Sequence, residues 1–103
     1  MNALPIGPGA RDDRPATALL YDHPNARIVA FHLLPGQQVA EHRSTSTVTV
    51  HVTEGSGVFR GSESESRLET GQIAVFEPDE VHSIDAGAEP LRFVAIITPR
   101  PGG

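Results

Sequence analysis

The segment 47–53 constrains the fold more than any other part of the sequence. It reads Thr-Val-Thr-Val-His-Val-Thr, with a valine at every second position and polar residues between. Successive side chains of a β-strand point to opposite faces, so this pattern predicts a half-buried strand. We expect Val48, Val50 and Val52 to point into a core and His51 to point away from it.

The remainder of the chain is divided into short segments by its ten glycines and nine prolines. This spacing favours many short strands and leaves no room for long helices. About nine strands are expected, hence an all-β sandwich or barrel. We expect turns or loops at 54–57 and 85–90 and strands at 16–21, 26–34, 37–42, 47–53, 57–60, 67–69, 73–76, 81–84 and 91–98.

A length of 103 residues fits one domain. We expect residues 1–14 to form an N-terminal extension, residues 15–100 the domain and residues 101–103 a tail. The first ten residues have neither the basic start nor the apolar stretch of a signal peptide. No apolar run approaches the ~20 residues of a membrane-spanning helix. A cytoplasmic protein without a membrane partner is therefore expected.

The composition excludes several kinds of chemistry. The sequence contains no cysteine and no lysine, which removes disulfides, thiolate catalysis, cysteine-based zinc sites and Schiff-base chemistry. The formal net charge is −5, no basic stripe is visible, and tryptophan is absent. We therefore expect no nucleic-acid partner.

Two stretches carry histidines at regular distances from glycines. In the first, Gly36 precedes His42 by six positions, and Gly55 follows after the valine-rich segment. In the second, Gly71 is followed by Pro78 and then by His82. This arrangement resembles the two motifs of the cupin superfamily, G-x5-H-x-H-x3-E-x6-G and G-x5-P-x-G-x2-H-x3-N. The resemblance covers roughly residues 26–98.

The sequence departs from both motifs at several positions. In the first, Ser44 stands at the position of the second histidine and Val48 at that of the glutamate. In the second, the proline is displaced by one position, Asp79 replaces the glycine and Ala86 replaces the asparagine. The resemblance implies a double-stranded β-helix, a jelly-roll-type barrel with a ligand pocket inside.

In metal-binding cupins three histidines and one glutamate converge on a divalent metal. By this resemblance His42 and His82 match two of the metal ligands, whereas Ser44 and Val48 do not match the other two. A catalytic metal usually keeps three protein ligands, so two imidazoles would hold a divalent ion such as Zn, Cu, Ni, Fe or Mn only weakly.

Other polar side chains are expected to point elsewhere. Strand alternation places Glu41 and Arg43 on the face opposite to that of His42. It also places His51 and His32 on the outer face, in surface or interface roles.

Three interpretations of His42 and His82 stay open. They are residual barrel histidines that hydrogen-bond each other, water or Ser44; they hold a metal; or, without a metal, they act as acid and base or bind an organic ligand. The expected pocket residues are Ser44, Val48, Val50, Val52 and Phe93. These features favour a small cupin that binds a small molecule or a divalent metal. The alternative is a metal-dependent enzyme such as a dioxygenase or isomerase. No catalytic residue and no organic cofactor is assigned.

The expected oligomer is a homodimer. A barrel built from so short a chain leaves edge strands that need covering. The segment 16–21 lies outside the motif-bearing body and is the expected interface.

Overall fold

The computed structural model describes residues 1–5 and 7–101, and within them the fold is all-β, as predicted. No helix long and apolar enough to cross a membrane occurs in these residues. The predicted tail 101–103 is described only at Pro101. The seven strands are β1 (Ala16–His23), β2 (Ala26–Leu33), β3 (Gln38–His42), β4 (Thr47–Arg60), β5 (Glu65–Glu69), β6 (Ile73–Phe76) and β7 (His82–Thr98).

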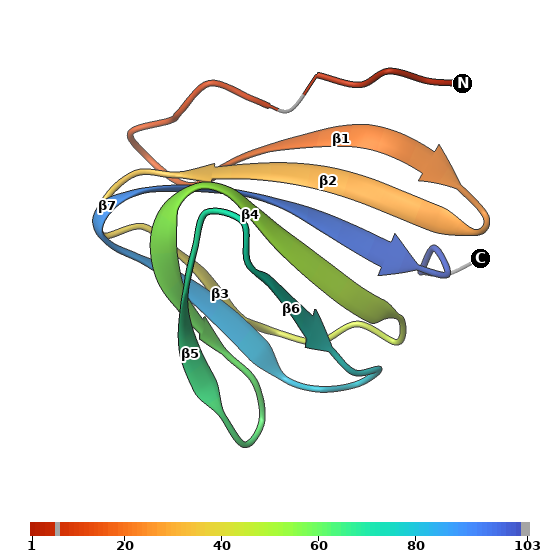
Figure 1. Cartoon of the computed structure of the whole chain (residues 1–103). Helices are drawn as coiled ribbons and strands as arrows, with labels where there is room; N and C mark the ends of the chain where they lie inside the picture. Colours follow the sequence, from red (N-terminus) through yellow and green to blue (C-terminus); the bar gives the residue numbers. More distant parts are fainter. Residues whose placement is uncertain (6, 102–103) are drawn as a thin grey trace.

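Two long strands, β4 and β7, pair antiparallel along most of their lengths and organise the fold (Figure 1). The C-terminal half of β7 lies between β2 and the first half of β4, with β1 and β6 added outside. The N-terminal half of β7 lies between β3 and the second half of β4, with β5 added outside. The chain thus makes two layers from one curled sheet, which is not closed.

The expected turn at 54–57 is wrong, because β4 continues through it. Pairing with β7 shifts register on both sides of Gly55, whose φ of +80° is the left-handed conformation that glycine tolerates. The expected loop at 85–90 likewise lies inside β7. Glycine here bends the strand from one layer into the other instead of reversing it, so the nine expected strands become seven.

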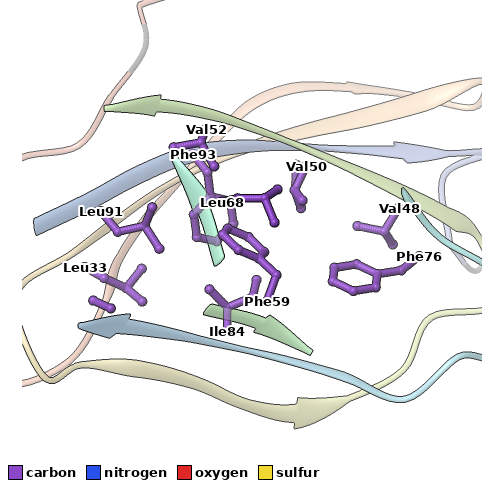
Figure 2. Close-up of a cluster of buried hydrophobic side chains, with 12 residues drawn as sticks. Leu33, Val48, Val50, Val52, Phe59, Leu68, Phe76, Ile84, Leu91 and Phe93 are labelled. Carbon is purple, nitrogen blue, oxygen red and sulfur yellow. The ribbon is translucent and has the colours of Figure 1, made fainter. Parts of the chain in front are cut away.

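The core lies between the two layers (Figure 2). Val48, Val50 and Val52 are all buried there, as the alternation predicted. Phe93 is 1% exposed, and its ring lies 4.6 Å from that of Phe31 and 5.5 Å from that of Phe59. Aromatic rings at these distances pack favourably, so Phe93 of β7 holds the two layers together.

The N-terminal segment contacts the outside of this sheet. The carbonyl of Pro8 accepts a hydrogen bond from Arg92 Nη2 at 3.2 Å, and the Arg11 carbonyl accepts one from Gln37 Nε2 at 2.7 Å. The Pro8 carbonyl also lies 3.2 Å from the Nδ1 atom of His32. The expected outward direction of His32 is therefore observed, with the N-terminal segment against its ring.

The close approach of the two long strands predicts an unequal response to alanine at two glycines. An alanine Cβ at Gly55 would lie 1.8 Å from the Pro90 carbonyl oxygen, whereas Gly36, with φ of +81°, has no neighbouring atom within 4 Å. Gly36→Ala should cost about 1 kcal/mol from the left-handed backbone alone, and Gly55→Ala about 3 kcal/mol or more. Urea unfolding measures both values. Equal costs would contradict the close crossing of β4 and β7.

Candidate functional site

A cavity of about 410 Å³ lies between the two layers at one end of the barrel. Its wall is mostly apolar and comes from β2, β3, β4 and β7, from the segment between β3 and β4, and from Pro101. The polar side chains on it are His42, Arg43, Ser44, Thr45 and His82. An apolar cavity with a few polar groups is the usual form of a small-molecule site.

His42 and His82 lie side by side in this cavity. They are direct partners across the β3–β7 pairing, and their ring centroids are 4.1 Å apart at an angle of 66°. His82 is 3% exposed and stacks on Phe76, with ring centroids 4.3 Å apart. His42 is exposed and stands at the mouth of the cavity. The pair therefore connects the buried wall with solvent.

A β-bulge in β3 brings His42 to the cavity. Val39 pairs with Ile84 and His42 pairs with His82, so three steps on β3 correspond to two on β7. Without the extra residue, Val39 and His42 would point to opposite faces. With it, both side chains line the cavity.

Backbone carbonyls fix the tautomer of both histidines. The Nδ1–H of His42 donates to the Ala40 carbonyl at 2.9 Å, and the Nδ1–H of His82 donates to the Glu80 carbonyl at 2.9 Å. A carbonyl oxygen can only accept, so Nδ1 carries the proton in each neutral ring. Both Nε2 atoms are then lone-pair acceptors, and neither is hydrogen-bonded to a residue that the structure describes. The Ser44 hydroxyl bonds neither ring and accepts from Ser46 N–H instead.

The surroundings of His82 favour its neutral form. Burial lowers the pKa of His82 below its ordinary 6.5, and the neighbouring His42 acts in the same direction. The hydrogen bond to the Glu80 carbonyl and the charge of Glu80 oppose this change without reversing it. His82 is therefore a neutral hydrogen-bond acceptor at pH 7.

The turn before His82 is held by Glu80. One carboxylate oxygen accepts from Glu77 N–H at 2.9 Å, and the other accepts from the Ser62 N–H and hydroxyl at 3.0 and 3.2 Å. These hydrogen bonds lower the pKa of Glu80, those from the two backbone N–H groups most. Asp79, at the motif's glycine position, has a φ of +65°, which aspartate tolerates better than most residues. The turn thus places the carbonyl that orients the His82 ring.

Most of the expected pocket residues line the cavity, and one does not. Ser44, Val48, Val50 and Phe93 are on its wall. Val52 is fully buried in the core but does not line the cavity. It points to the same face as Val50 but lies two residues further along β4. Period-two alternation identifies the inward face but not the depth along the barrel.

Several residues that line the cavity do not follow from the sequence pattern. Arg43 was expected on the opposite face, but it follows the last residue of β3, beyond the reach of strand alternation, and lines the cavity. Further apolar lining residues are Phe31, Val39, Ile84, Ala95, Ile97 and Pro101. Of these, Ala95 and Ile97 follow Phe93 at every second position of β7, so alternation along that strand indicates them.

The metal-ligand set stays incomplete. Among the described residues no group of three or more histidine, cysteine, aspartate or glutamate side chains could hold a metal ion. Val48, at the motif's glutamate position, is 6% exposed and presents only apolar surface. His51 is exposed on the outer face, as expected. Two imidazoles without a third protein ligand do not fit the set that a resident catalytic metal usually needs.

Protonation of His82 predicts a pH dependence of stability. Because its pKa is lower in the fold, the unfolded chain takes up a proton first as pH falls below 6.5, and stability decreases until the folded value is reached. Urea unfolding in the presence of a chelator, from about pH 7.5 to 5.5, should show this loss for the wild type. The free energy of unfolding of His82→Phe should decrease less over this pH range, whereas that of His51→Phe, a change on the outer face, should decrease as in the wild type. An unchanged loss in His82→Phe would contradict the burial of a neutral ring.

Comparison with solved structures gives the same fold. The Thermus thermophilus protein TT1209 has a TM-score of 0.86 and 24% identity, and the match covers 91% of each chain. An uncharacterized double-stranded β-helix protein from Klebsiella pneumoniae has a TM-score of 0.83 and 26% identity over 92% of this chain and 85% of that one. A predicted oxalate decarboxylase from Thermotoga maritima has a TM-score of 0.75 and 27% identity, covering 81% of this chain and 78% of its own.

Comparison of sequences identifies the family. No curated protein matches this chain significantly. The cupin domain family matches residues 29–97. This segment begins in β2, ends in β7 and contains His42 and His82. With this match over most of its length, and with the double-stranded β-helix of its structural neighbours, the chain belongs to the cupin domain family.

Proposed function

We propose that this cupin binds a small organic molecule with an apolar body in the cavity between its two layers. The observation that carries the proposal is the fixed tautomer of the histidine pair. Because both Nδ1–H groups donate to backbone carbonyls at 2.9 Å, both Nε2 atoms offer lone pairs. A ligand that donates a hydrogen bond, such as a hydroxyl compound, satisfies them.

The size and wall of the cavity support this proposal. A volume of about 410 Å³ lies within the range of ~300–1,000 Å³ typical of small-molecule sites. Phe31, Val48 and Phe93 supply apolar contact for the body of the ligand. A ligand without a donor would cover the His82 acceptor and leave it unpaired, which costs affinity. The pair therefore selects for a donor group.

A metal-dependent activity has less support. Metal-binding relatives by motif use four ligands, and here two of those positions hold Ser44 and Val48. Carbonyl-anchored imidazoles are the form that metal ligands take, so the pair is chemically competent to contribute two bonds. The missing third ligand nevertheless favours organic binding, and we propose no catalytic step for either histidine.

Phenol and anisole test the proposed function directly. Both have an aromatic body, but only phenol donates a hydrogen bond. Phenol should bind about tenfold more tightly than anisole, the value of one hydrogen bond to a buried acceptor. NMR titration of the histidine ring signals measures both affinities and identifies the site.

The His82→Phe variant should abolish the preference for phenol while it retains the stacking on Phe76. His51→Phe, the same change on the outer face, should retain the preference. Binding of neither compound at the cavity would overturn the proposal. Retention of one equivalent of Zn²⁺ after gel filtration, lost in His42→Ala and His82→Ala but not in His32→Ala or His51→Ala, would replace it with a metal site.

We also propose that the chain forms a homodimer. β1 is an edge strand of the sheet and carries Leu19, whose exposure is 59%. An exposed edge with an apolar side chain is a surface that proteins usually cover. Light scattering at tens of micromolar should report a dimer, and Leu19→Lys should shift it toward the monomer, whereas Thr17→Lys on the same strand should shift it less. A monomeric wild type would contradict this arrangement.

A further inference from the structure

The position of Arg43 in the cavity gives information about the ligand. Arg43 immediately follows His42, is exposed, and lines the same cavity as the histidine pair. It is therefore a cation at the open end of a mostly apolar space. Nothing in the proposed binding of a neutral donor uses this charge.

No acidic side chain that the structure describes neutralises Arg43. The chain has thirteen acidic residues and eight arginines. Six of the arginines form ion pairs, namely Arg11, Arg27, Arg60, Arg67, Arg92 and Arg100. Arg43 and Arg14 form none with the described residues, and only Arg43 lies at the cavity. A cation left unpaired in an acidic chain, at the mouth of a cavity, is suited to an anionic ligand.

The backbone on both sides of Arg43 is fixed. His42 is held by its pairing with His82. The Ser44 carbonyl accepts from Asp79 N–H at 2.7 Å, and the Ser44 hydroxyl accepts from Ser46 N–H at 3.1 Å. These contacts tie the segment after β3 to the turn that orients His82. Arg43 is thus placed next to the histidine pair by hydrogen bonds that do not involve its own side chain.

We propose that the ligand is a hydroxy carboxylic acid with an apolar body. This inference rests on the proposed function and adds the class of its polar group. The hydroxyl donates to an Nε2 of the histidine pair, and the carboxylate accepts from the Arg43 guanidinium, whose planar donors match two carboxylate oxygens. The apolar body lies against Phe31, Val48 and Phe93.

Three related probes separate the two polar contacts. Mandelate carries the hydroxyl and the carboxylate, mandelamide lacks the negative charge, and phenylacetate lacks the hydroxyl. Titration calorimetry at neutral pH should show mandelate binding about tenfold more tightly than either of the others, as expected for one charge-assisted or buried hydrogen bond. Arg43→Gln should remove the advantage over mandelamide. Arg14→Gln, the same change in charge outside the cavity, should retain it, and His82→Phe should remove the advantage over phenylacetate.

The outcomes distinguish this inference from the proposed function. Equal affinity for mandelate and mandelamide, or an advantage that survives in Arg43→Gln, overturns the carboxylate assignment. Equal affinity for mandelate and phenylacetate overturns the hydroxyl assignment. If phenol binds at the histidine pair and mandelate does not, the proposed function stands and this inference fails. If neither binds there, both fail.

Discussion

The antiparallel pairing of β4 with β7 is the constraint on which the rest of the structure depends. Every other strand except β1 pairs with one of these two, and β1 pairs with β2, which pairs with β7. The crossing at Gly55 and Pro90 lets the same two strands serve both layers. The register of β7 also fixes the site, because β3 pairs with its first residues and so brings His42 opposite His82.

The chemistry of the site follows from backbone geometry more than from the side chains alone. The bulge in β3 turns His42 toward the cavity and leaves the Ala40 carbonyl beside its Nδ1 atom. The Glu80 carboxylate holds the turn before His82, and the Glu80 carbonyl lies beside the Nδ1 atom of His82. Each imidazole is therefore oriented by main-chain atoms two residues before it. Orientation by the local backbone keeps both Nε2 atoms available, since no other side chain is needed to hold the rings.

The sequence indicated the fold through local patterns and missed what depends on contacts distant in sequence. Alternation at 47–53 identified the inward valines, and the glycine–histidine spacing identified His42 and His82 as neighbours in a barrel. The sequence around Gly55 is compatible with either a turn or a bend within a strand. The difference comes from the pairing with β7 near Pro90, which is remote along the chain. Arg43 was misplaced for a similar reason, since alternation gives no direction beyond the end of a strand.

The departures from the family motif change what the cavity can recognise. A glutamate at position 48 would add negative charge beside the histidines and favour a cation. Val48 instead adds apolar wall, which raises the cost of charge on the buried His82 imidazole and lowers the dielectric around its lone pair. Arg43 contributes a permanent positive charge at the mouth of the cavity. The site therefore differs in polarity from that of a metal-binding cupin. The neutral His82 acceptor lies inside and the Arg43 cation lies at the entrance, and the proposed ligand, an anion that donates a hydrogen bond, complements both.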